Sequence, residues 1–304
     1  MKISATIICK NEQECIQRCL DSLFLIDEIV VCDTGSTDNT MEILRAAQKT
    51  MPDGKLVIVE HPWDDHFAAA RNACLKHATG DWCVIIDCDE TLDSFAVINL
   101  TKQILSYPEA KTFRFLCTSA EHENNKHWMV RAHKREAGIF WKGRIHEALN
   151  HDDVIQAEGC GIHYGYSPAH ALDPDRCLRL LKREHDDAIN AGKEPEPRIL
   201  YYLAREYWYR KDYQQAIFYF TQRTKTMGFR PECADAWLYI ARCYWITQHG
   251  DNARGAALNA ILLAPEFKEA FLLLAEMSFP EEAASWLKYA QYANNTGILF
   301  NRTA

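Results

Sequence analysis

The chain has 304 residues, of which 48% are hydrophobic, and a formal net charge of −8 at pH 7. A chain of this length and composition is expected to form about two globular domains with sizeable cores. This net negative charge disfavours nucleic acid or an anionic membrane as a partner, without excluding a local basic patch between Lys126 and Arg144.

Three short apolar runs near the start of the chain end in acidic or small polar side chains. They occupy residues 6–12, 29–40 and 83–90. Such β-branched runs are typical of parallel strands buried on both faces, and ligands of open α/β sheets bind beyond the carboxyl ends of those strands. The polar ends are therefore expected to converge on one crevice.

The acids at these strand ends predict a nucleotide diphosphate as the ligand. Asp87 and Asp89 flank Cys88, and residues two apart in an extended segment project to the same side. Carboxylates suit Mg²⁺ or Mn²⁺, which usually leave coordination positions for substrate phosphates. Asp33 precedes a Thr-Gly-Ser-Thr-Asp turn, where an acid can hold a ribose hydroxyl or a base N–H. The alternative is that Asp33 only starts a loop and that the other two acids are solvated.

Four short motifs carry a family resemblance. They are Ile8–Glu12, Asp33–Asp38, Phe67–Asn72 and Asp87–Glu90. Together they resemble family 2 glycosyltransferases of the A-type, nucleotide-diphospho-sugar transferase (GT-A) fold, over about residues 3–168. The resemblance points to the branch of bacterial lipopolysaccharide-core glucosyltransferases and the sublancin-type S-glycosyltransferase, whose members often carry tetratricopeptide repeats. It implies an α/β domain with a mostly parallel sheet and a metal-dependent, inverting hexosyl or pentosyl transfer.

The same resemblance implies which residues border the nucleoside. Asp33 matches the acid that reads the base, and Cys9, Asn11 and Glu12 lie where the end of the first strand meets the nucleotide sugar. UDP is the usual carrier in the family, so a UDP-sugar is the expected donor.

Two further motifs match the elements that handle the diphosphate. Arg71 is expected near the base or diphosphate, where its fork can donate two hydrogen bonds, and Asn72 is expected to hold the loop together. Asp89 matches the ligand of Mn²⁺ or Mg²⁺. Asp87 is expected to contact ribose, or the metal through water, and Cys88 completes this donor-binding segment.

A later aromatic run, residues 138–147, resembles the His-Glu element of the branch. Inverting transfer needs a base that deprotonates the acceptor, and a carboxylate within hydrogen-bond reach is sufficient. Glu147 is therefore the candidate base, and His146 either orients it or binds the diphosphate. The alternative for Glu147 is an ion pair with Arg144 or Arg131.

The segment 160–166 resembles a His-Xaa-Gly-Tyr element of the same branch. Its His163 is the candidate third metal ligand, because imidazole is a common ligand of Mn²⁺. The alternative is a core histidine bonded to the backbone.

The pattern changes after residue 168 from strand-like runs to helical periodicity. We expect a catalytic domain over 1–168, a helical connector over 169–198 and an all-α, tetratricopeptide-like region over 199–304. Pro231 and Pro265 are 34 positions apart, which is the period of that repeat. The similar segments are Leu200–Tyr207, Trp237–Tyr244 and Phe271–Glu276.

The partners of the repeats and the acceptor stay open at this point. The repeats are expected to recognise a peptide, to self-associate into a homo-oligomer, or only to cap the catalytic domain. Saccharide, lipid-linked and peptide acceptors are all compatible with the motifs, as is a modified DNA base. A non-catalytic scaffold with a degenerate transferase domain is the alternative outside enzymes. A nucleotidyltransferase is disfavoured because residues 9–12 lack a Gly-rich, basic loop for a triphosphate.

The twelve cysteines are scattered through apolar runs and form no Cys-x-x-Cys pair. Free Cys often behaves as a small buried hydrophobe, so we expect a reducing compartment, the cytoplasm. No charged-then-apolar leader precedes the first strand, and no run approaches the ~20 apolar residues of a spanning helix.

Overall fold

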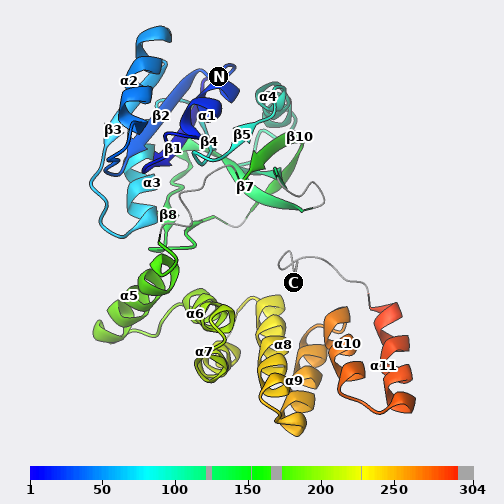
Figure 1. Cartoon of the computed structure of the whole chain (residues 1–304). Helices are drawn as coiled ribbons and strands as arrows, with labels where there is room; N and C mark the ends of the chain where they lie inside the picture. Colours follow the sequence, from blue (N-terminus) through cyan, green and yellow to red (C-terminus); the bar gives the residue numbers. More distant parts are fainter. Residues whose placement is uncertain (121–124, 152, 166–172, 227, 294–304) are drawn as a thin grey trace. The chain divides into compact units, whose positions relative to one another are not determined.

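The computed structural model describes residues 1–120, 125–151, 153–165, 173–226 and 228–293. The chain divides into two compact units, Met1–Pro174 and Asp175–Ala304 (Figure 1). The domain boundary predicted at residue 168 falls in the segment 166–172, which lies outside the described residues.

The described part of the first unit is built on an eight-stranded sheet with the order β3-β2-β1-β4-β7-β6-β10-β5. The pairs β2–β3, β1–β2, β1–β4 and β6–β10 are parallel, whereas β4–β7, β6–β7 and β5–β10 are antiparallel. A separate hairpin pairs β8 with β9. The strands are β1 (Ile3–Cys9), β2 (Glu28–Asp33), β3 (Leu56–Glu60), β4 (Trp82–Ile85), β5 (Thr91–Leu92), β6 (Thr112–Ser119), β7 (Lys126–Lys134), β8 (Trp141–Lys142), β9 (Ala148–Leu149) and β10 (Ile155–Tyr164).

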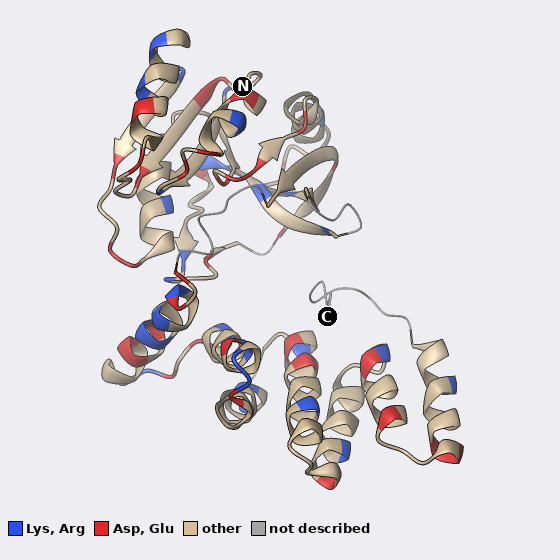
Figure 2. Ribbon diagram, viewed as in Figure 1, with Lys and Arg blue, Asp and Glu red and all other residues tan. Residues whose placement is uncertain are grey.

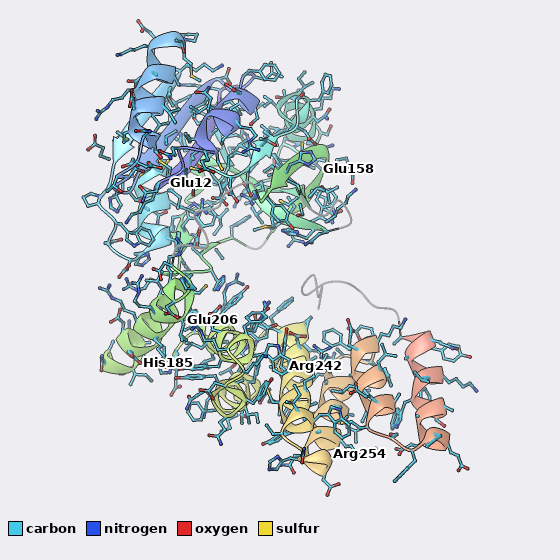
Figure 3. All side chains as sticks on the ribbon, viewed as in Figure 1. Glu12, Glu158, His185, Glu206, Arg242 and Arg254 are labelled. Atoms are coloured by element: carbon cyan, nitrogen blue, oxygen red, sulfur yellow. The ribbon has the colours of Figure 1, made fainter. Side chains whose placement is uncertain are left out.

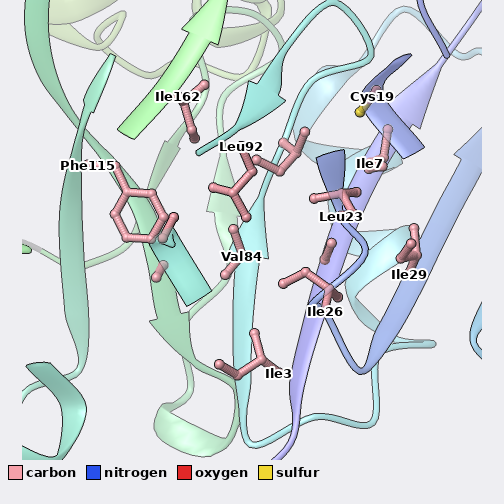
Figure 4. Close-up of a cluster of buried hydrophobic side chains, with 14 of the residues drawn as sticks. Ile3, Ile7, Cys19, Leu23, Ile26, Ile29, Val84, Leu92, Phe115 and Ile162 are labelled. Atoms are coloured by element: carbon pink, nitrogen blue, oxygen red, sulfur yellow. The ribbon is translucent and has the colours of Figure 1, made fainter. Parts of the chain in front are cut away.

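Helices cover both faces of this sheet at β2, which explains why that strand is apolar between its terminal acids Glu28 and Asp33. Along β2, Ile29 and Val31 belong to a cluster with α1, α2 and α4, and Val30 and Cys32 belong to a second cluster with α3. Figure 4 shows part of the first cluster, where Leu23 lies near strand side chains. Each fully buried aliphatic side chain contributes about 1.5–3 kcal/mol. The helices are α1 (Ile16–Ser22), α2 (Thr40–Thr50), α3 (Phe67–Leu75), α4 (Ala96–Ser106) and the 3₁₀ turn η1 (Arg135–Ala137).

The parallel register brings the predicted strand ends to one edge of the sheet. Cys9, the last residue of β1, pairs with Asp33, the last residue of β2. On the other side of β1, Thr6 pairs with Ile85, which ends β4 two residues before Asp87. The three predicted polar clusters therefore start from adjacent strands.

The second unit is helical in its described residues. Pro occupies a first-turn position of α6, α8 and α11, where its missing N–H costs no helical hydrogen bond. Acidic and basic side chains are interspersed on the helices (Figure 2). Helix α5 lies within the range predicted as a helical connector, 169–198. The helices are α5 (Arg176–Asn190), α6 (Pro197–Tyr209), α7 (Tyr213–Lys225), α8 (Arg230–Ile246), α9 (Gly250–Leu263), α10 (Lys268–Glu276) and α11 (Pro280–Tyr292).

Small residues let these helices pack in successive pairs. Ala253, Ala257 and Ala260 of α9 are fully buried, as are Ala234 and Ala241 of α8, and α8 packs against α9. The predicted fold, a mostly parallel α/β domain followed by tetratricopeptide-like helices, is confirmed. Among the described residues, no helix is both long enough and apolar enough to span a membrane.

Candidate active site

The turn after β2 is organised by the carboxylate of Asp33. One oxygen accepts hydrogen bonds from the backbone N–H groups of Gly35 and Ser36, each at 3.0 Å, and the other accepts from the Ser36 hydroxyl at 2.5 Å. Gly35 has φ +99°, a conformation that strongly favours glycine. Asp33 is 5% exposed. The motif acid therefore shapes its own turn, a role that the sequence reasoning missed.

The end of β1 is tied to the same turn. The backbone N–H of Asn11 donates to Ser36 Oγ at 2.9 Å, and its side-chain oxygen accepts from the Thr37 N–H at 2.7 Å. The N–H of Glu12 donates to Thr40 Oγ1 at 2.8 Å, at the start of α2. Figure 3 labels Glu12 in this region. The residues predicted to border the nucleoside thus form one hydrogen-bonded wall.

Two arginines hold the carboxylate of Asp87. Arg71 donates from Nη2 to Asp87 Oδ1 at 2.8 Å, and Arg131 Nη1 lies 3.5 Å from Oδ2. Burial alone would raise the pKa of Asp87, but the two guanidinium groups hold it at about 2. Asp87 is therefore ionised at any physiological pH.

The other donor edge of Arg71 binds the candidate base. Its Nε donates to Glu147 Oε1 at 2.5 Å, and both side chains are 12% exposed. Burial would lower the pKa of Arg71, but the carboxylates of Asp87 and Glu147 raise it above its ordinary value. The Arg71 guanidinium lies between the two acids.

The ion pair of Glu147 is thus formed with Arg71 and not with either arginine expected from the sequence. Arg144 donates to the carbonyl oxygen of Asp65 at 3.0 Å, whereas Arg131 binds Glu90. Arg71 and Glu147 are 76 positions apart, so spacing in the sequence could not identify the partner.

The hairpin of β8 and β9 packs against Arg71 through Trp141. The guanidinium of Arg71 lies 4.9 Å from the centroid of the Trp141 ring. The side chain of Asn72 donates to the Trp141 carbonyl and accepts from the Trp141 N–H, both at 2.9 Å. With these two hydrogen bonds to the Trp141 backbone, Asn72 has the loop-holding role expected of it.

Arg131 and Glu90 form a buried pair that the sequence reasoning did not single out as part of the site. Arg131 donates to both oxygens of Glu90, at 2.9 and 2.5 Å, and Glu90 also accepts from the Asp87 N–H at 2.9 Å. Burial raises the pKa of the Glu90 carboxyl, and the charge of Arg131 opposes that rise. Strand β7 also carries Lys126, His127, His133 and Lys134, so its sequence alone does not mark Arg131 as the residue that binds the acidic motif.

The remaining predicted residues occupy different settings. Cys88 is buried, and its thiol donates to the Ile8 carbonyl at 3.1 Å, which anchors the acidic segment to β1. Asp89 is half-buried. His163, on β10, has its Nε2 2.9 Å from Oδ1 of Asp93, so its contact is with a side chain and not with the backbone. Asp152, near the His-Glu element, lies outside the described residues.

A metal ion would find few protein ligands here. Within the described ranges, no group of three or more His, Cys, Asp or Glu side chains is arranged to hold a metal. Mg²⁺ nevertheless needs only one or two carboxylates when substrate phosphates supply the other oxygens. Asp87 fits that role poorly, because its oxygens face two guanidinium groups.

Residues 4–162 match the family model described as Glycosyl transferase family 2. A TPR repeat-containing protein of Synechococcus elongatus is 40% identical over 212 residues, which are 69% of this chain and 43% of that protein. The lipopolysaccharide core biosynthesis glycosyltransferase LpsC of Rhizobium meliloti is 34% identical over 107 residues, 35% of this chain and 38% of LpsC. The chain therefore spans less than half the length of these curated relatives.

Among solved structures, TarS 1–349 of S. aureus in complex with UDP-GlcNAc aligns over 98% of this chain and 91% of that chain. The sequence identity is 13% and the TM-score is 0.47.

Proposed function

Because the chain belongs to glycosyl transferase family 2, we propose that its first unit transfers a sugar from a nucleotide-diphosphate sugar to an acceptor, with inversion at the transferred carbon. The observation that carries this proposal is the Asp87–Arg71–Glu147 chain, which connects the acidic donor motif to a candidate base. A UDP-sugar is the proposed donor, as the family resemblance implies.

The wall formed by the ends of β1 and β2 is the proposed nucleoside site. Asn11 is fixed there by the turn that Asp33 organises and Glu12 by Thr40 at the start of α2, and Cys9 pairs with Asp33 in the strand register. A preformed wall reduces the ordering that binding would otherwise require. The backbone and side chains of Cys9, Asn11 and Glu12 then contact base and ribose, while Asp33 keeps the turn in place.

Asp89 is the proposed ligand of Mn²⁺ or Mg²⁺, with His163 of β10 as a further ligand. When bound, the ion would offset the negative charge of the diphosphate as it leaves. Asp87 and Cys88 hold the segment from which Asp89 projects, through the contacts to Arg71 and to Ile8. Metal dependence rests on the family resemblance and on the donor chemistry of these residues.

Glu147 is the proposed general base. The acceptor oxygen or sulfur forms a bond to the sugar carbon while the bond from that carbon to the diphosphate oxygen breaks, and Glu147 takes the acceptor proton. Arg71 occupies Oε1 of Glu147 and so fixes the direction in which the second oxygen faces. Arg71 is therefore proposed to position Glu147 rather than to contact the nucleobase directly.

The acceptor is proposed to be a saccharide, a lipid-linked saccharide or a peptide. The name of the Rhizobium meliloti relative, a lipopolysaccharide core biosynthesis enzyme, supports the saccharide or lipid-linked classes. The second unit is proposed to recognise the acceptor or to join copies of the chain.

The twelve free cysteines, eleven of them buried, support a reducing compartment such as the cytoplasm. The degenerate-scaffold alternative is disfavoured because Asp87 of the donor motif and Glu147 are joined through Arg71 in one ion-paired network.

Binding of UDP with and without Mn²⁺ tests the proposal. Asp89→Ala should abolish the Mn²⁺-dependent part of UDP binding, measured by calorimetry, and leave the thermal midpoint close to wild type because the residue is only half-buried. Asp53→Ala, an exposed acid in the turn before β3, is the matched control. Undiminished Mn²⁺ dependence in the Asp89 variant would remove that residue from the metal site.

A further inference from the structure

A β-bulge delivers one arginine of β7 to the acidic motif. In the pairing of β6 with β7, Phe113 lies opposite Ala132 but Arg114 lies opposite Val130, so Arg131 is the extra residue. Bulges re-aim a side chain and are over-represented next to active sites. Three successive residues of β7, 131–133, are buried as a result.

The arginine so placed is almost fully desolvated. The side chain of Arg131 is 6% exposed and that of Glu90 is 4% exposed, and the guanidinium contacts both carboxylate oxygens. The Nε of Arg131 is buried and has no hydrogen-bond partner among the described residues. A buried ion pair contributes little net stability compared with well-packed apolar residues of similar volume. Fold stability is therefore a weak reason for this pair.

Its position relative to the donor motif supplies a better reason. Glu90 accepts the N–H of Asp87, and Arg131 Nη1 lies 3.5 Å from Asp87 Oδ2. Backbone and side chain of Asp87 are thus held from one direction, while Arg71 holds the other carboxylate oxygen. The five side chains alternate in sign from Glu90 through Arg131, Asp87 and Arg71 to Glu147.

We propose that Arg131, seated on Glu90, is a positioning residue that fixes Asp87 and the acidic loop for the donor diphosphate. The inference rests on the proposed function, because it assigns the donor to this motif. Lys cannot replace Arg here, since an ammonium lacks the planar fork that contacts Glu90 and Asp87 together.

The decisive variant neutralises the pair and keeps its shape. Arg131→Met alone would leave the Glu90 charge buried without a partner and is expected to fold poorly. The double variant Glu90→Gln, Arg131→Met removes both charges, so its thermal midpoint is expected to stay near that of wild type. Arg114→Met, an exposed arginine on the adjoining strand β6, is the control.

The readouts are the UDP dissociation constant with and without Mn²⁺, and the kinetic constants for the donor. The double variant is expected to weaken UDP binding and to raise the donor KM by at least about tenfold, because Asp87 loses its charge-assisted contact with Arg131. The kcat at saturating donor is expected to change less. The Arg114 control is expected to match wild type in both.

Three results would overturn the inference. They are wild-type UDP binding in a folded double variant, a double variant that unfolds far below wild type, which would make the pair structural, and full activity in Arg131→Lys. Failure of the proposed function is distinguishable, because wild-type protein itself would then bind no UDP and turn over no nucleotide sugar.

Discussion

Replacing Glu147 by Gln removes the proposed proton acceptor and keeps the shape of the side chain. Glu147 accepts from Arg71 Nε at 2.5 Å in a setting where both side chains are 12% exposed. The Gln amide oxygen can accept the same bond, so the variant exchanges a charge-assisted hydrogen bond for a neutral one. That exchange costs about 1 kcal/mol, which lowers the thermal midpoint of a unit of this size by roughly 2–4 °C.

Turnover should fall far more than stability. A general base contributes ~10²–10⁴-fold, which corresponds to about 3–5 kcal/mol of the activation barrier. The donor KM should change little, because the base acts on the acceptor proton in the transition state. The difference between the small stability effect and the large kinetic effect is what separates a base from an anchoring carboxylate.

The assay is the initial rate of UDP release at saturating donor with a hydroxyl acceptor, beside thermal unfolding of the same samples. Glu158→Gln is the matched control, since Glu158 is an exposed acid on β10 (Figure 3). A thiol acceptor should show a smaller loss, because a thiol ionises far more readily than a hydroxyl. Wild-type turnover of Glu147→Gln on a hydroxyl acceptor would refute the assignment.

Two further predictions concern buried acids at opposite ends of β2. Asp33→Ala leaves the backbone N–H groups of Gly35 and Ser36 without their acceptor. The free energy of chemical unfolding should therefore fall by about 1–3 kcal/mol, and UDP binding should weaken. An unchanged unfolding free energy together with unchanged UDP affinity would show that the turn does not depend on Asp33. Burial opposes the ionisation of Glu28, but hydrogen bonds from Ser4, Thr79 and Lys2 lower its pKa to about 2. The contribution of ionised Glu28 to folding stability is therefore complete above pH 4.5 and is lost as the pH falls toward 2. Glu28→Gln should therefore lower the unfolding free energy by about 1–3 kcal/mol at pH 7 and by less near pH 2, with donor binding unaffected; a stability gap that does not narrow with acid would contradict this sign.

The central strands could be predicted because their composition matches their surroundings. Both faces of β2 are covered, so Ile29 to Cys32 are apolar without alternation. The second half of the sheet could not be predicted in the same way. Strand β7 runs antiparallel between β4 and β6, and its bulge at Arg131 depends on the register between strands, which no single run of residues encodes.

The candidate site shows the same division between motifs and partners. Asp33 and Asp87 could be found because each follows an apolar strand, and Arg71 and Glu147 because each belongs to a motif. The ion pair between Arg71 and Glu147 joins residues 76 positions apart, and it forms only when α3 and the segment after β8 are packed together. Likewise, the bonds of the Asp33 carboxylate to its own turn become visible only with the backbone in place.

The most direct test of the central claim is to incubate the wild-type protein with a panel of nucleotide sugars, with and without Mn²⁺. Release of the nucleotide and the anomeric configuration of the freshly released or transferred sugar are followed by proton NMR. We predict metal-dependent release from a UDP-sugar, with the new anomeric configuration opposite to that of the donor. Retention of configuration would contradict the inverting mechanism, and absence of release from every nucleotide sugar, together with absence of nucleotide binding, would contradict the proposed function itself.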